Sequence, residues 1–217
     1  MTVLRSIDLR CPVCEAQFRA QAVMATNAFG GKQTDFREIS SGTQPLPYQV
    51  HRCNECGYAG PEGAFTTDEP FSPLIAEQVR RELTPAAGAM PATASEKYEA
   101  AARIVEWQSA TPRQVGELLL RAAWCAADEH DGEAERYFRL RAARTFERGL
   151  ASYDAVPREE RAVLTYLVGE LWRRAGDSKQ ATAWFNRVPD EIVSPVDQRW
   201  IAQLAAQQRD RAREWLA

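Results

Sequence analysis

Two pairs of cysteines are the residues of this sequence with the clearest chemistry. They lie in Cys11-Pro12-Val13-Cys14 and Cys53-Asn54-Glu55-Cys56. Two residues between the cysteines of a pair let both sulfurs reach one ion, and two such turns complete a tetrahedron with Zn–S distances of about 2.3 Å. The spacing predicts one structural Zn²⁺ per chain, with iron as the main variation. Its predicted ligands are Cys11, Cys14, Cys53 and Cys56.

The turns that follow the two pairs differ at one position. Gly57 follows the second pair, where a positive φ is often needed, and Glu15 stands at the matching place after the first pair. The glutamate weakens the fit slightly and leaves a different turn open for the first pair. A site closed by four thiolates has no free position for a substrate, so its expected role is structural.

Thiol exchange is a second interpretation of the first pair. Cys11 to Cys14 resembles the active-site frame of glutaredoxin-like proteins, in which a helix N-terminus lowers the pKa of the first thiol. The residues that follow alternate like a strand, however, no βαβ pattern surrounds the pair, and a second pair is present. These features favour metal binding and leave redox chemistry as the less favoured alternative.

A nucleic-acid-associated zinc ribbon is a third interpretation. Phe18, Phe36 and Tyr48 could stack on bases, although their spacing also suits the core of a small domain. The formal net charge of −3 disfavours this class of protein, because nucleic-acid-binding domains usually carry a basic stripe. Neither histidine is an expected ligand: His51 lies near four better thiolate donors, and His130 lies in an acidic stretch that suits a helix end.

Composition places the chain among soluble globular proteins. It has 217 residues, of which 45% are hydrophobic and 26% charged. No run approaches the roughly 20 apolar residues of a membrane-spanning helix, and the first ten residues lack the apolar region of a signal peptide. We therefore expect no membrane association and a cytoplasmic location, where five cysteines indicate metal binding or redox chemistry before disulfides.

The first 70 residues predict a small β domain around the cysteines. Ala16 to Ala22 alternate in polarity, as do Tyr48 to His51, and each alternation predicts a short strand beside a cysteine pair. Between them, Thr26 to Pro47 predicts a long loop, in which Asp35-Phe36-Arg37 is the only concentrated mixture of apolar and charged residues. The division is residues 1–70 for a zinc-ribbon-like domain and 71–94 for a helix and linker.

Residues 95–217 predict an all-α domain. Thr111 to Gln114 fits a capping box, and Asp177 with Gln180 and Ser194-Pro195 with Asp197 supply two more plausible helix starts. Short links such as Gly176-Asp177 imply antiparallel neighbouring helices. Apolar residues recur at helical spacing throughout the region. The predicted helices are residues 96–109, 112–128, 133–153, 158–175, 178–187 and 195–215.

One segment of the helical region resembles a tetratricopeptide-type hairpin. In such hairpins a small residue lets two helices approach and a large residue plugs the gap, and Gly169, Ala181 and Phe185 occupy the matching places. No second unit appears at the usual period of about 34 residues, which indicates a divergent array of longer helices. The predicted fold class is therefore α+β, a small zinc-ribbon domain followed by a tetratricopeptide-like array.

The order of these features resembles a family of bacterial proteins that carry a domain of unknown function. The resemblance rests on Cys11 to Cys14, the loop containing Asp35, the stretch from Tyr48 to Ala59 and the helical tail. It implies architecture and the metal-ligand role of the four cysteines, but no reaction.

The predicted function is a non-enzymatic interaction module. Helical arrays offer an extended concave surface for other proteins, and the sequence lacks the known catalytic motifs. We expect a protein partner, whose identity and pathway the sequence leaves open together with the oligomeric state.

Overall fold

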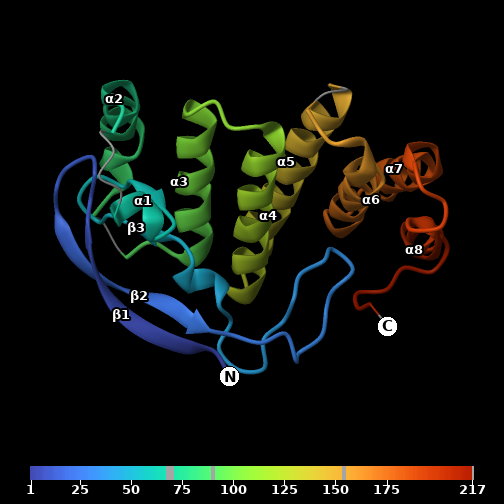
Figure 1. The fold of residues 1–217 in the computed structure, drawn as a ribbon, viewed down its shortest axis with the longest axis horizontal. Coiled ribbons are helices and arrows are strands. Elements are labelled where there is room, and N and C mark those ends of the chain that lie inside the picture. Colours follow the sequence, from blue (N-terminus) through green and yellow to red (C-terminus); the bar gives the residue numbers. More distant parts are fainter. Residues whose placement is uncertain (67–70, 89–90, 153–154, 217) are drawn as a thin grey trace.

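The computed structural model describes residues 1–66, 71–88, 91–152 and 155–216. The chain has an α+β fold in which short antiparallel strands precede a row of helices (Figure 1). The strands are β1 (Val3–Arg10), β2 (Gln17–Ala25), β3 (His51–Arg52) and β4 (Ala59–Gly60). The α-helices are α1 (Gly63–Thr66), α2 (Pro73–Glu82), α3 (Ala94–Trp107), α4 (Pro112–Asp128), α5 (Gly132–Ala151), α6 (Arg158–Arg174), α7 (Ser178–Arg187) and α8 (Arg199–Asp210). Three 3₁₀ turns, η1 (Leu46–Tyr48), η2 (Thr84–Ala86) and η3 (Val188–Glu191), complete the described elements.

The cysteine pairs lie at the ends of two antiparallel hairpins. In the first hairpin β1 pairs with β2, so that Leu9 faces Phe18 across the pair. The strand predicted over residues 16–22 is confirmed as part of β2, whereas its partner β1 was not predicted. In the second hairpin the two-residue strands β3 and β4 pair, and His51 faces Gly60.

The strand predicted from Tyr48 is wrong at its start. Residues Leu46 to Tyr48 form the turn η1, and the strand begins at His51. Pro45 and Pro47 explain the difference, since proline fixes φ near −65° and has no N–H for a strand ladder. Alternating polarity alone could not reveal this local constraint.

Helix caps account for most of the boundaries in the helical half. The predicted capping box at Thr111 is confirmed, because Gln114 N donates to the Thr111 hydroxyl and the Gln114 side chain accepts from Thr111 N at 2.9 Å. Asp177 likewise accepts from Gln180 N at 2.9 Å and starts α7 as predicted. The last helix is shorter at both ends than the predicted residues 195–215. Gln198 Oε1 accepts from Val193 N and Ser194 N before the helix, and Gln208 Oε1 accepts from Arg213 N after it.

The helices pack as antiparallel hairpins, and close contacts need glycine. A Cβ atom on Gly169 in α6 would lie 2.7 Å from the ring of Phe185 in α7, so these two residues lie against each other in the hairpin. A second pair of the same kind joins Gly116 in α4 to the ring of Phe146 in α5. Substitution of either glycine would push its two helices apart.

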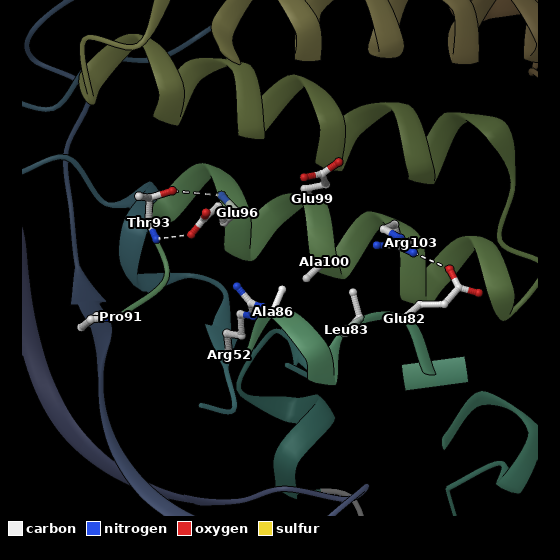
Figure 2. Close-up of a pocket in the computed structure, with 10 residues that line it drawn as sticks. All are labelled: Arg52, Glu82, Leu83, Ala86, Pro91, Thr93, Glu96, Glu99, Ala100 and Arg103. Carbon is white, nitrogen blue, oxygen red and sulfur yellow. Dashed lines mark hydrogen bonds and ion pairs between the residues drawn. The ribbon is translucent and has the colours of Figure 1, made fainter. Parts of the chain in front are cut away.

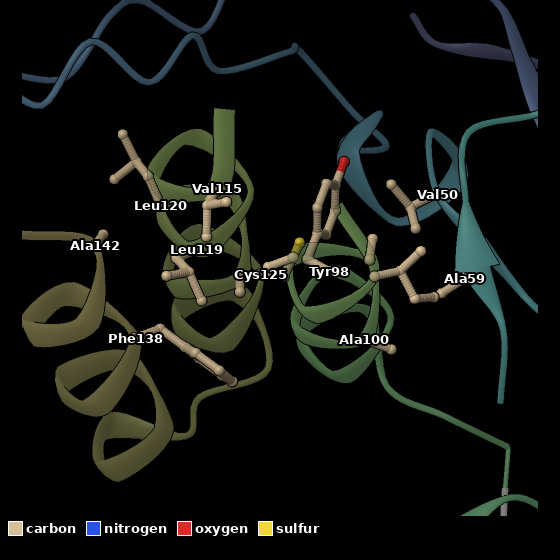
Figure 3. Close-up of a cluster of buried hydrophobic side chains, with 14 of the residues drawn as sticks. Val50, Ala59, Tyr98, Ala100, Val115, Leu119, Leu120, Cys125, Phe138 and Ala142 are labelled. Carbon is tan, nitrogen blue, oxygen red and sulfur yellow. The ribbon is translucent and has the colours of Figure 1, made fainter. Parts of the chain in front are cut away.

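The larger of two hydrophobic clusters among the described residues runs from the strands into the helices, and a smaller one lies among α6, α7 and α8. Val50 and Ala59 from the strand region belong to the same buried cluster as Tyr98 in α3 and Leu119 in α4 (Figure 3). Leu9 of β1 belongs to it as well. The Tyr98 hydroxyl also donates to the Leu46 carbonyl at 3.0 Å. The division at residues 70 and 94 thus stays a prediction about folding units, which share a continuous core.

The long loop between β2 and β3 turns back on itself at its tip. Lys32 bridges Glu38, and Gln33 N donates to the Arg37 carbonyl at 2.8 Å. Phe36 sits at the turn with φ of 67°. The chain near the C-terminus lies along the same tip, since Thr34 N donates to the Glu214 carbonyl at 3.0 Å and Gln33 pairs with Trp215.

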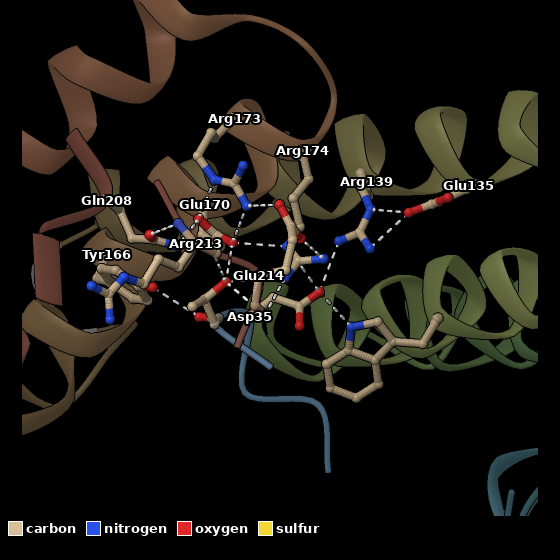
Figure 4. A network of polar contacts seen from close by, with 12 residues as sticks. Asp35, Glu135, Arg139, Tyr166, Glu170, Arg173, Arg174, Gln208, Arg213 and Glu214 are labelled. Carbon is tan, nitrogen blue, oxygen red and sulfur yellow. Dashed lines mark hydrogen bonds and ion pairs between the residues drawn. The ribbon is translucent and has the colours of Figure 1, made fainter. Parts of the chain in front are cut away.

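This tip carries a buried acid into the helical array. Asp35 is fully buried, and its Oδ2 accepts from Trp124 in α4 at 2.8 Å and from Arg139 in α5 at 2.9 Å (Figure 4). Arg174 in α6 lies 3.7 Å from the same oxygen. The loop is as long as predicted, but its charged tip is an anchor between the strand region and three helices.

A second carboxylate, Glu170 of α6, completes the network. It is fully buried and accepts from Thr34 Oγ1 at 2.6 Å and from the Nε atoms of Arg173 and Arg174, each at 2.8 Å. Gln208 of α8 reaches the same carboxylate at 3.2 Å. Buried charges persist only when they are paired and hydrogen-bonded, so loop, α6 and α8 must fold together here.

Candidate metal centre

The two cysteine turns have the same backbone geometry. Cys11 N donates to the Ala16 carbonyl at 2.9 Å, and Cys53 N donates to the Tyr58 carbonyl at 2.8 Å. Inside each turn, the amide of the fifth residue returns to the carbonyl of the first cysteine, in both cases at 2.9 Å. These amides belong to Glu15 and Gly57. Each hairpin thus delivers its two thiols through one repeated turn.

The identical turns settle the role of Glu15. It adopts a φ of 62°, and Gly57 a φ of 80°. The glutamate therefore makes the same left-handed turn that glycine makes in the second pair, at a cost of roughly 1 kcal/mol for its Cβ atom. The different turn left open for the first pair does not occur.

The four predicted ligands come together. Their Sγ atoms all lie within 4.8 Å of one another. Cys11 Sγ is 3.5 Å from Cys56 Sγ, and Cys14 Sγ is 3.5 Å from Cys53 Sγ. A tetrahedral ion with Zn–S distances of about 2.3 Å needs sulfurs about 3.8 Å apart. All five cysteines of the chain are free thiols, so no disulfide competes with the cluster.

Backbone amides point at the sulfurs as a thiolate site requires. The amides of Val13 and Cys14 donate to Cys11, and those of Glu55 and Cys56 donate to Cys53. Such donors favour the charged form of a thiol. The donor set and its surroundings therefore fit one thiolate-binding metal ion.

Three of the thiols differ widely in pKa, because their side chains are hydrogen-bonded to one another. Hydrogen bonds from Cys11 and then Cys56 lower the pKa of Cys53 to about 2. The hydrogen bond to Cys53 is the main cause that raises the pKa of Cys11 to about 12, and hydrogen bonds to Cys11 and Cys53 raise that of Cys56 further. Four like charges at this spacing need a positive ion between them before all can ionise.

Helix α2 covers one side of the second turn. Thr84 Oγ1, just after α2, donates to the Cys56 carbonyl at 3.1 Å. A Cβ atom on Gly57 would lie 2.9 Å from both the Cβ atom and the carbonyl oxygen of Leu83. Val79 of α2 is fully buried. The sequence predicted this segment only as a helix with a linker, because nothing local signals its contact with the cysteines.

The cluster is closed on most sides. Cys11, Cys53 and Cys56 are buried, and Cys14 is exposed. Burial of three donors leaves one edge open to solvent, which suits entry of an ion better than binding of a substrate between the sulfurs.

The remaining sequence candidates lie apart from the cluster. His51 is buried against the ring of Phe65, with centroids 6.3 Å apart, and burial lowers its pKa. His130 has φ of 59° and forms the turn between α4 and α5, as the helix-end interpretation predicts. Phe18 packs on Phe65 at 5.6 Å, and Phe36 packs on Tyr166 at 5.4 Å.

Comparisons with known proteins identify the family. Among the residues that the structure describes, no helix combines the length and apolar character needed to cross a membrane. Neither the curated proteins nor the solved structures contain a significant match. Residues 4–212 match a family described as "Uncharacterized protein conserved in bacteria (DUF2225)". The chain belongs to this family of uncharacterized bacterial proteins.

Proposed function

We propose that this protein is a non-enzymatic cytoplasmic interaction module in which one structural zinc ion, bound by the four clustered cysteines, fixes the strand region against a helical array. The observation that supports it is the closed cluster of four thiols within 4.8 Å. Zinc is favoured over iron because four thiolates in paired turns are the donor set of structural zinc sites. Zinc binding of this kind stabilises small domains by roughly 10–16 kcal/mol.

The placement of the cluster supports a structural role. Both hairpins have little core of their own, and a bound ion would join them where α2 packs on the second turn. A thiol-exchange enzyme would instead need an accessible, metal-free pair, and Cys11 lies buried beside Cys56. The cytoplasmic location in the proposal rests on the five unpaired thiols, which suit a reducing compartment.

We propose the N-terminal ends of α4 and α6 as the protein-binding surface. At the C-terminal ends of these helices, the loop tip with Asp35 fills the space between them. At the other ends a cleft of about 260 Å³ remains, and its apolar wall includes Val163, Leu164 and Leu167. Its rim carries Arg113, which forms ion pairs with Glu117 and Glu160, and Glu159. The rim therefore keeps an excess of negative charge and fits an apolar side chain flanked by basic residues.

Two measurements test the proposal. The purified protein should contain one zinc ion per chain and show no dithiol exchange, whereas iron or metal-free redox activity would contradict it. In affinity capture from the native cell, Val163→Arg should lose a protein that wild type retains, and Val193→Arg, at an exposed apolar site outside the cleft, should keep it. Equal capture by both variants would reject this surface.

A further inference from the structure

A second cavity lies where the β1–β2 hairpin, the turn η1 and the start of α3 meet. It has a volume of about 430 Å³, within the range of small-molecule sites. Its wall combines Phe18 and Arg19 of β2, Tyr48 of η1, Arg52 of β3 and Lys97 of α3. Three separate parts of the chain thus supply cationic and aromatic groups to one space.

The charge of this cavity is opposite to that of the whole protein. Arg19, Arg52 and Lys97 line it together with His51, and among the residues that the structure describes no aspartate or glutamate does. The whole chain has a net charge of −3. A cationic lining in an acidic protein is not a by-product of overall composition, and it creates a local positive potential.

Two of the three cations have no carboxylate partner among the described residues. Arg19 forms an ion pair with Asp8 at 3.2 Å, and both side chains are exposed. Lys97 Nζ donates to the Pro47 carbonyl at 3.3 Å and makes no ion pair, and Arg52 makes none either. Both residues are half-buried. Burial lowers the pKa of Lys97, although the nearby charge of Glu129 acts in the opposite direction.

Two of the three glutamates in the neighbouring cleft are paired with arginines. In the neighbouring cleft, which shares Arg52 and Pro91 with this cavity, Glu82 pairs with Arg103 and Glu96 accepts from Thr93 N (Figure 2). Glu99 of the same cleft pairs with Arg141. Glu96 keeps its negative charge in that cleft, but among the described residues it forms no ion pair with Arg52 or Lys97.

The walls of the cavity are held in place. Lys97 Nζ donates to the Pro47 carbonyl, and the Tyr98 hydroxyl donates to the Leu46 carbonyl. Two consecutive residues of α3 thus hold η1 in place. The ring of Phe18 packs edge-to-face against the ring of Phe65. A site whose walls are fixed loses little conformational entropy when a ligand binds.

We propose that this cavity binds a small phosphorylated ligand with a planar ring, of the nucleoside monophosphate class. Arg52 and Lys97 would hold the phosphate, and Tyr48 and Phe18 offer aromatic surface to the base. One bounded cavity favours a small molecule over a nucleic-acid strand, which needs a continuous basic groove. The inference is independent of the protein-binding proposal.

The test uses the full zinc-loaded chain and calorimetric titration with AMP, GMP, adenosine and inorganic phosphate. We expect saturable binding of at least one nucleoside monophosphate, and binding of adenosine weaker by about tenfold or more, since a charge-assisted contact contributes about 1.5–3 kcal/mol, or more than tenfold. Lys97→Gln should weaken the nucleotide by a similar factor and Tyr48→Ala by severalfold. Lys179→Gln, an exposed lysine of α7, should leave the affinity unchanged.

Zinc content and circular dichroism of each variant show whether it is folded. A folded Lys97→Gln with wild-type nucleotide affinity would overturn the proposal. So would equal binding of adenosine and AMP, or no saturable binding of either nucleotide at about 5 mM, a weak limit for a specific site. A twenty-nucleotide single strand that binds with steep salt dependence, while mononucleotides do not, would replace it with strand binding.

Discussion

Replacing Asp35 with alanine should destabilise the whole protein although the residue lies in a loop. Its carboxylate is fully buried and contacts Trp124, Arg139 and Arg174 from three helices. Removing one member of a buried ion pair costs about 3–5 kcal/mol, because the partner charge stays buried. Arg139 keeps Glu135 at 2.8 Å as a second partner, and Asp35 Oδ1 has no hydrogen bond among the described residues. Both facts favour the lower end, about 3 kcal/mol.

The assay measures the free energy of unfolding in urea, monitored by circular dichroism and tryptophan fluorescence. In thermal unfolding of a chain of this length, a loss of about 3 kcal/mol corresponds to a Tm lower by roughly 6–12 °C. Asp8→Ala is the matched control, because Asp8 also pairs with an arginine, but at an exposed site. We expect no measurable change there. If the free energy of unfolding of Asp35→Ala lies within about 1 kcal/mol of the wild-type value, the loop tip does not anchor the helices.

The pH dependence gives an independent check. Burial by itself would raise the pKa of Asp35, but the charges of Arg139 and then Arg174 outweigh it, so the pKa lies below 3.8. Because the folded-state pKa is below the unfolded one, this stabilisation is complete above about pH 4 and disappears as the pH falls through the folded value. The difference between wild type and Asp35→Ala should therefore shrink only below about pH 4. A difference that is constant down to pH 2 would refute the ion pair.

Three further predictions concern the turns and the metal. Gly57→Ala should destabilise by more than about 2 kcal/mol and weaken zinc retention against a chelator, because an alanine there is strained and meets Leu83. Glu15→Gly should stabilise by about 1 kcal/mol and slow chelator removal, whereas His130→Gly, at the same φ in a helix turn, should stabilise equally without affecting zinc. Wild-type chelation kinetics in Glu15→Gly would contradict the shared turn. Cys53→Ser should lower the metal content and loosen residues 1–67. If the two parts are separate folding units, the helices after residue 95 should survive in this variant, and circular dichroism measures their content.

Local sequence patterns predicted much of the architecture. The capping residues Thr111 and Asp177 marked helix starts correctly, because a cap depends on residues three positions apart. The Gly169 and Phe185 pair could be assigned because a helical hairpin places its two residues in fixed register. The strand predicted from Tyr48 was wrong at its start. Alternating polarity favoured a strand there, whereas Pro45 and Pro47 favoured the turn that forms.

The sequence by itself determined which atoms could hold a metal. Four cysteines in two repeated spacings leave little freedom for their sulfurs, since each turn is a local structure and one ion can satisfy both.

Only the tertiary structure decided what the long loop does. Asp35-Phe36-Arg37 has the composition of an exposed turn, and nothing near it in the sequence indicates that Arg139 and Arg174 lie where its carboxylate arrives. The same holds for the cavity beside Lys97, whose cations come from three segments. Burial and charge pairing depend on neighbours far apart in the chain, so these features exist only once the strands, loop and helices have packed together.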